Sequence, residues 1–239
     1  VVKETTNQTS FYGMGVDIAD FNNDSYLDYI QVDMDAKDNR RSKANMASMN
    51  PDLFWSTVNY GFHYQYMHNT LQLNRRIQGD KPFFSNISRL SGISSTDWSW
   101  GPLLADLDND GWKDLFISNG IRREINHRDF FNDIKLRPMS SDSLLYYTEQ
   151  MPSEAIANFT FQNNSDLTFT DVTESWGLDQ KNFSNGATYA DLDNDGDLEL
   201  IVNNVDQEAQ IYRNNSTNNF IKVKLKGSDQ NLIGIDSRV

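Results

Sequence analysis

The chain has 239 residues, a formal net charge of −13 and no cysteine. This length suffices for one large β domain, the lack of cysteine excludes a disulfide framework, and the acidic charge argues against a nucleic-acid partner, which would require a basic face. No run of about 18 apolar residues occurs, so the sequence predicts no transmembrane segment. The chain opens on Val1 without a basic and apolar leader, which we interpret as a processed or excised segment.

Three acidic loops of nine residues recur along the chain, at 20–28, 106–114 and 191–199. Each places oxygen-bearing side chains at positions 1, 3, 5 and 9 and a turn residue at position 6. Calcium is a hard cation that takes about six to eight oxygen ligands, and this spacing suits it. A solvated acidic turn is the competing interpretation, because Asp, Asn and Gly favour turns in any context. Three copies in register favour calcium, with about three ions bound.

The predicted ligands are the four oxygen-bearing side chains of each loop and the backbone carbonyl at position 7. They are Asp20, Asn22, Asp24, Tyr26 and Asp28; Asp106, Asp108, Asp110, Trp112 and Asp114; and Asp191, Asp193, Asp195, Asp197 and Glu199. Ser25 stands where the other loops have Gly111 and Gly196, and a positive φ there would cost roughly 1 kcal/mol. Glu199 replaces the ninth-position Asp, so the third site is expected to bind calcium with altered geometry.

The flanks of the loops exclude the EF-hand, whose twelfth loop residue is a bidentate Glu between two helices. In the three loops of this chain, the twelfth position is occupied by Gln31, Ile117 and Val202, respectively. Short apolar stretches that are typical of strands flank each loop, so each loop is predicted to be the turn of a strand–loop–strand unit. The preceding stretches are 15–19, 101–105 and 186–190, and the following ones are 27–32, 115–118 and 198–202.

The repeat extends beyond the loops. Further predicted strands lie at 69–74 and 83–87, at 158–163 and 169–172, and again at 210–214. Without two inserts, at about 33–68 and 121–157, the unit is roughly 54 residues with four short strands, which is typical of a β-propeller blade. The sequence therefore predicts an all-β fold of about three blades with two short helical inserts. Closed propellers have about four to eight blades, so we expect part of a larger propeller or an open array that a partner completes.

Both inserts are predicted to contain a loop and a short helix, at 50–59 and 140–149, from a Pro just inside one helix start and capping residues before the other. Aromatic residues gather in the first insert and could stack on sugars or anchor a protein, although packing against the sheets is the alternative. Basic residues at 40–43 and 122–123 could hold an acidic ligand or simply be solvated. The aromatic and histidine residues concerned are Phe54, Trp55, Tyr60, Phe62, Tyr64, Tyr66, His63, His68 and His127.

A Gly-containing strand that leads into Asp-x-Asp-x-Asp-Gly-x-x-Asp resembles the FG-GAP or VCBS repeat β-propellers, over about three quarters of the chain. Within that group, 98–116 and 118–121 look like the ASPIC/UnbV-associated secreted proteins related to cartilage acidic protein. Residues 219–239 are similar to the opening of the ASPIC/UnbV domain. The resemblance implies propeller blades over 1–218, an ASPIC/UnbV-like β segment over 219–239, calcium in the acidic loops, no catalytic residues, and an extracellular or outer cell-surface location.

We therefore expect a calcium-binding module that acts as a scaffold, as a subunit or segment of a larger surface assembly. We expect its partner to be a protein or a surface glycan that binds at the inserts. A membrane-associated surface complex is a further option. The alternative is a carbohydrate-binding or polysaccharide-processing surface protein that uses the aromatic inserts. Two carboxylates could hydrolyse a glycoside, but the conspicuous ones have calcium spacing and no nucleophile motif is present. The sequence thus predicts no enzyme and no organic cofactor.

Overall fold

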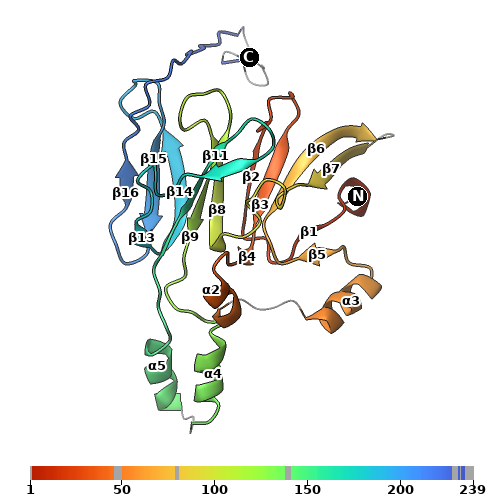
Figure 1. Cartoon of the computed structure of the whole chain (residues 1–239), viewed down its shortest axis with the longest axis vertical. Helices are drawn as coiled ribbons and strands as arrows, with labels where there is room; N and C mark the ends of the chain where they lie inside the picture. Colours follow the sequence, from red (N-terminus) through yellow and green to blue (C-terminus); the bar gives the residue numbers. More distant parts are fainter. Residues whose placement is uncertain are drawn as a thin grey trace.

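The computed structural model describes residues 2–45, 50–78, 81–137, 141–227, 231 and 233–234. Most of the regular structure in these ranges is antiparallel β-sheet, with short helices gathered mainly at one end of the molecule (Figure 1). The all-β class predicted from the sequence is confirmed. Among the helices in these ranges, none is long and apolar enough to cross a membrane.

The first large sheet has four strands in chain order, and each pairs antiparallel with the next. They are β2 (Gly15–Ala19), β3 (Asp28–Val32), β6 (Thr70–Gln78) and β7 (Lys81–Asn86). Alternate residues of β3, among them Ile30 and Val32, are fully buried. Side chains alternate between the two faces of a strand, so β3 presents one apolar face to the core.

The second and third sheets repeat this order along the chain. The second contains β8 (Asp97–Ala105), β9 (Asp114–Asn119), β11 (Phe159–Asn163) and β12 (Phe169–Asp171), with β4 (Met34–Asp35) beside β8. The third contains, within the described residues, β14 (Ser184–Ala190), β15 (Glu199–Asn204) and β16 (Gln210–Tyr212). Two short ladders pair β1 (Thr9–Ser10) with β5 (Gln65–Tyr66), and β10 (Ile156–Ala157) with β13 (Lys181–Asn182).

The first strands of the three sheets lie side by side, because β8 contacts both β2 and β14. One apolar cluster joins the first sheet to the second and includes Ile30, Leu104 and Phe161. Another joins the second sheet to the third and includes Phe116 and Val202. Each junction buries apolar side chains from both of its sheets, which is the main source of stability in such a packing.

Both predicted inserts contain helices, and each has two where the sequence predicted one. The first insert holds α2 (Asn39–Ala44) and α3 (Pro51–Asn59), the second holds α4 (Arg128–Ile134) and α5 (Ser141–Glu149), and a single turn, α1 (Val2–Thr5), begins the described chain. The inserts follow β3 and β9, while the acidic loops precede these strands, so the four insert helices lie at the end of the sheets opposite to the loops (Figure 1).

Helix capping explains both the correct and the missed helix starts. The side chain of Asn50 accepts hydrogen bonds from Asp52 N and Leu53 N, which confirms the predicted start of α3. Asp38 caps α2 in the same way, but the six residues of that helix are mainly charged and polar and show no apolar periodicity. His127 Nδ1 accepts from Phe130 N at the start of α4. Ser140, the first residue of the other predicted helix, lies outside the described residues.

The segment after the third sheet has no regular secondary structure over residues 219–227. Of the ASPIC/UnbV-like segment predicted over 219–239, residues 228–230, 232 and 235–239 lie outside the described residues. The described part runs past the third acidic loop, where Lys222 Nζ forms an ion pair with Asp191 Oδ2 at 3.2 Å.

Candidate metal centre

Each acidic loop joins the first two strands of its sheet in the same register. Position 9 of the loop is the first residue of β3, β9 or β15, and it pairs with the last residue of β2, β8 or β14. The loops are therefore equivalent turns in three successive sheets, as the sequence predicted for a strand–loop–strand unit.

Position 6 has a positive φ in all three loops: 70° at Ser25, 91° at Gly111 and 96° at Gly196. This confirms the expected demand for glycine, and Ser25 carries a strain of roughly 1 kcal/mol. Position 4 is also left-handed, and each loop has there an Asn, the residue that tolerates this conformation best after glycine. The two left-handed residues turn the chain sharply around the acidic side chains.

Backbone amides of the first two loops hold the position 1 carboxylate in the turn. Asp20 accepts from Asp24 N at 3.1 Å and from Ser25 N at 2.7 Å. Asp106 accepts from the corresponding Asp110 N and Gly111 N, both at 3.0 Å. The position 5 carboxylate in turn accepts from the amide at position 7, as in Tyr26 N to Asp24 Oδ1 at 3.0 Å and Trp112 N to Asp110 Oδ1 at 2.8 Å.

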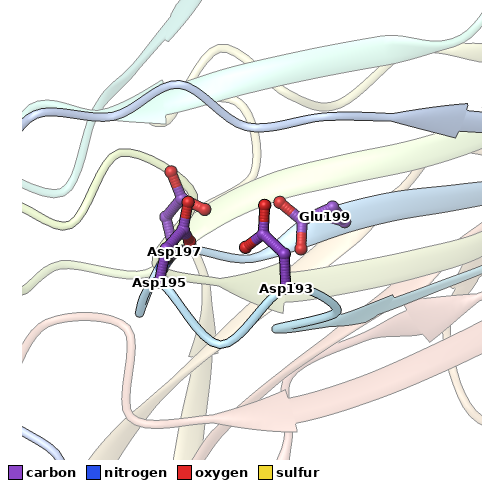
Figure 2. Close-up of side chains that lie close together, drawn as sticks. All are labelled: Asp193, Asp195, Asp197 and Glu199. Carbon is purple, nitrogen blue, oxygen red and sulfur yellow. Dashed lines mark hydrogen bonds between the residues drawn. The ribbon is translucent and has the colours of Figure 1, made fainter.

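The predicted ligands converge to different degrees. In the second loop, carboxylate oxygens of Asp106, Asp108 and Asp114 lie within 4.8 Å of one another, and Asp110 is not in this cluster. In the third loop the cluster is Asp193, Asp195, Asp197 and Glu199 (Figure 2). Asp191 is outside it, and the side chain of Asp197, whose carbonyl was the predicted ligand, belongs to it.

The first loop brings three side-chain oxygens together without a carboxylate cluster of the same kind. Asn22 Oδ1 lies 3.1 Å from Asp20 Oδ1 and 3.3 Å from Asp24 Oδ1. Oxygens at this separation repel unless the amide turns so that its nitrogen donates, or a cation lies between them. The ninth-position carboxylate of this loop, Asp28, accepts from Phe21 N and Asn74 N.

Burial of the acidic groups disfavours their ionised form and so raises their pKa values. It raises the pKa of Asp28 and that of Asp114 to about 7 in each case. Burial, with the hydrogen-bonded Asp195 carboxylate beside it, also raises the pKa of Asp197 to about 6. A divalent cation would stabilise the ionised form of these carboxylates, because an adjacent opposite charge favours ionisation.

One asparagine per sheet clamps the ninth-position carboxylate, a feature that the sequence analysis missed. Asn163 N donates to Asp114 Oδ1 at 3.0 Å, and its side-chain amide donates to the carbonyl of Lys113 at 3.0 Å. Asn74 makes the same two bonds to Asp28 Oδ1 and to the carbonyl of Leu27. Asn214 makes them to Glu199 Oε1 and to the carbonyl of Leu198. The only sign of this clamp in the sequence is an Asn that recurs at the end of the third predicted strand of each repeat unit.

Neighbouring loops are tied together by amide side chains. Asn23 Nδ2 donates to the carbonyl of Gly111 at 3.0 Å, and Asn109 Nδ2 donates to that of Gly196 at 3.2 Å. The asparagine of the next sheet adds a second bond, since Asn163 Nδ2 also reaches the carbonyl of Phe21 at 2.9 Å. The three loops therefore form one hydrogen-bonded row along the end of the sheets.

The donor set is the kind that a hard cation prefers. The converging atoms are carboxylate and amide oxygens, with no nitrogen or sulfur ligand among the described groups. Asp191 Oδ1 and Asp197 Oδ1 in the third loop are buried without a hydrogen-bond partner, although a buried oxygen ordinarily has one. A cation bound there would satisfy such atoms.

The three histidines lie outside the acidic clusters of the described chain. His63 Nε2 contacts the Thr6 hydroxyl at 3.0 Å, and the buried His68 holds its Nδ1 2.7 Å from the carbonyl of Asn69. His127 caps α4. The acidic clusters found in the described residues contain none of the three.

The predicted aromatic surface of the first insert is partly core and partly exposed. Phe54 is buried and packs its ring against Tyr64 and Tyr66. Trp55 and Tyr60 remain 57% and 82% exposed, respectively. Both interpretations of these aromatic residues therefore apply. Some rings pack the insert, and others remain exposed, where a ligand could contact them.

One basic residue of the first insert, Arg41, is the centre of a buried ion network. Arg41 is 5% exposed and forms two hydrogen bonds with Asp97, of 2.5 and 2.8 Å. Its third nitrogen donates to Glu124 and Glu154, both at 2.9 Å. Arg40 pairs with Glu154 nearer the surface. Arg41 is therefore neither a solvated charge nor a site for an external acidic ligand, and it ties α2 to the second insert.

No family model matches the chain, and the search of curated proteins likewise gives no match.

Proposed function

We propose that this chain is a calcium-binding β-propeller segment that acts as a binding or scaffold module of a secreted or cell-surface protein. The observation that carries the proposal is the threefold repetition, in successive sheets, of an acidic turn whose ninth carboxylate is held by the same asparagine. Solvated turns need no such support, whereas a metal site requires its ligands to be fixed by neighbouring groups.

The propeller arrangement is supported by the order of the strands. In each large sheet, successive strands of the chain are spatial neighbours, and the first strands of adjacent sheets lie together. A propeller places the first strand of every blade around a central axis. The resemblance to FG-GAP and VCBS repeats, and to the ASPIC/UnbV-associated proteins, is part of the same proposal.

Calcium would have a structural role. Asp20, Asn22 and Asp24 would hold it in the first loop, and the two carboxylate clusters would hold it in the second and third. The ion would supply the positive charge that opposes carboxylate repulsion. A cation that binds the folded chain alone adds its binding free energy to the stability of the fold.

The inserts are the proposed partner surface, at the end of the sheets away from the metal sites. A protein of a larger surface assembly is the first candidate, and no catalytic role is proposed. A surface glycan is the second candidate, because the exposed rings of Trp55 and Tyr60 offer flat apolar faces. Binding of glycans that is lost in Trp55→Ala with the fold intact would favour this alternative.

Thermal unfolding with a count of bound ions tests the proposal. The chain would be stripped with a chelator, dialysed against calcium or magnesium, and analysed by calorimetry and atomic emission. We expect about three calcium ions per chain and a higher unfolding midpoint in calcium than in magnesium, because these oxygen clusters suit the larger ion. No bound calcium and equal midpoints would show that the acidic loops are ordinary turns.

A further inference from the structure

An open groove lies between the second and third sheets. It has a volume of about 530 Å³ and is lined by Leu107, Trp176, Leu178, Leu200 and Tyr212, among others. At its margin runs β16, which pairs on one side with β15 and, within the described residues, with no strand on the other. An unpaired strand edge next to an apolar groove is a place where a further strand can add.

The preceding junction shows what fills the equivalent space. There Phe169, the first residue of β12, belongs to the core cluster with Ile93 and Leu115, and its ring lies 6.0 Å from that of Phe21. Phe169 N donates to the carbonyl of Ser91 at 3.1 Å. By the repeat, the counterparts of Phe21, Ser91, Ile93 and Leu115 are four lining residues of the groove: Leu107, Trp176, Leu178 and Leu200.

The sequence supplies a counterpart of Phe169 at the matching distance. Asn163-Asn-Ser-Asp-Leu-Thr-Phe169 aligns with Asn214-Asn-Ser-Thr-Asn-Asn-Phe220 without a gap. Both segments begin with the same turn, in which the Asn side chain accepts from the amide two residues later: Ser165 N to Asn163 Oδ1 at 2.9 Å, and Ser216 N to Asn214 Oδ1 at 3.0 Å. Asn218 stands at the place of Leu167, which has a positive φ of 72°, and asparagine tolerates that conformation readily.

The segment that begins at Phe220 is amphipathic and largely unsupported. Residues 220–226 alternate apolar and lysine side chains after Phe220, which favours a strand. Phe220 is 48% exposed and Ile221 89% exposed, and both belong to a stretch without regular structure. Its contacts include the Phe220 ring over Gly196 and the pair Lys222–Asp191, whose lysine side chain is 65% exposed, and a pair with so exposed a partner contributes little.

We propose that residues 220–223 dock on β16 as the fourth strand of the third sheet and place Phe220 in the groove. The register follows from β11 and β12, where Phe161 faces Asp171 and Asn163 faces Phe169. Tyr212 then faces Lys222, Asn214 faces Phe220, and Phe220 N donates to the carbonyl of Trp176. Ile221 lies beside Ile211 on the outer face. The segment has two positions, the one over the third loop and the docked one.

A cysteine pair tests the register in a chain that has no cysteine of its own. In β11 and β12 the flanking residue pairs carry the ladder hydrogen bonds, Asn164 N to Thr168 O and Val172 N to Thr160 O. The Phe161–Asp171 pair is thus a non-hydrogen-bonded one, where Cβ atoms are close enough for a disulfide. We expect Tyr212→Cys with Lys222→Cys to cross-link under mild oxidation, and Tyr212→Cys with Lys224→Cys to remain reduced. Equal cross-linking of both pairs, or of neither, would overturn the register.

Hydrogen exchange on the unsubstituted chain keeps the test independent of Tyr212, which packs in the core. We expect the amides of Ile221 and Val223, which face β16 in hydrogen-bonded pairs of the docked register, to exchange about tenfold or more slowly than unstructured amides. Phe220→Asp should abolish this protection, and Ile233→Asp, which changes an exposed residue outside the docking segment, should leave it. Exchange of both amides at the unstructured rate in the unsubstituted chain would contradict docking.

Discussion

The backbone amide of Asn163 donates to the carboxylate of Asp114 at 3.0 Å, and the side chain of the same asparagine reaches the carbonyls of Lys113 and Phe21. One residue therefore fixes the ninth position of its own loop and joins that loop to the preceding one. The side chain of Asn163 is buried. If it is removed, the carbonyls that it bonds lose their hydrogen-bond donor, and leaving such a group unpaired costs more than a typical hydrogen bond contributes.

Asn163→Ala keeps the backbone amide that holds Asp114 but removes the side-chain donor of the Lys113 and Phe21 carbonyls, so it should lower the free energy of unfolding by about 1–3 kcal/mol. Because these two bonds tie the second loop to the first, their loss should also weaken calcium binding at the second loop. Asn164→Ala is the matched control, because Asn164 is exposed and bonds only to neighbouring threonines of its own hairpin. Urea unfolding in calcium and in chelator measures both effects. Equal midpoints for the two variants would show that the side-chain bonds of Asn163 to the two carbonyls do not stabilise the chain.

Ser25→Gly should stabilise the chain by about 0.5–1 kcal/mol, because glycine adopts the φ of 70° at this position without strain. The bond that Ser25 N donates to Asp20 Oδ2 is retained, since it involves only the backbone of residue 25. The same change at Ser42, within α2, should destabilise the chain, because glycine is unfavourable inside a helix. Thermal unfolding of the two variants should therefore shift in opposite directions, and a shift of the same sign would refute the assignment of strain to Ser25.

The acidic loops were predictable because all of their candidate ligands lie within nine residues, so spacing alone carries the signal. The asparagine clamp was not, because Asn163 stands 49 residues from Asp114 in the chain and only the strand pairing brings the two together. Glu199 belongs to the cluster of the third loop together with the side chain of Asp197, of which the sequence analysis named only the carbonyl. The orientation of this side chain depends on the chain that follows β16 in the same sheet, where Ser216 N donates to Asp197 Oδ2 at 3.1 Å.

In the inserts, too, features set by adjacent residues were predictable, whereas contacts between residues far apart in the chain were not. The start of α3 follows from the Asn–Pro pair at 50–51, which is a local signal. The role of Arg41 does not, because its partners Asp97 and Glu124 are 56 and 83 residues away. A basic cluster read from the sequence alone resembles a solvated face, and only the fold shows that one of its members is buried.

Asp195→Asn should remove calcium from the third loop and leave the other two ions in place, so that the count falls from about three to about two. Asp195 belongs to the cluster in which four carboxylates meet, and a neutral amide removes charge without changing size. Asp179→Asn, at an exposed acidic residue outside the loops, is the matched control and should keep the full count. Isothermal titration with calcium measures the number of sites. An unchanged count in Asp195→Asn would exclude the third loop as a site.

Arg41→Ala should lower the free energy of unfolding by about 3–5 kcal/mol, because it leaves the buried carboxylates of Asp97 and Glu124 without their counter-charge. Burial already raises the pKa of Glu124, and Arg41 is the group that opposes this. Arg40→Ala removes an exposed arginine from the same helix and should change little. Arg41→Met combined with Asp97→Asn and Glu124→Gln should recover much of the loss, because no unpaired buried charge then remains. Chemical unfolding of the three variants distinguishes a charge effect from a packing effect, and a triple variant no more stable than Arg41→Ala would assign the loss to packing.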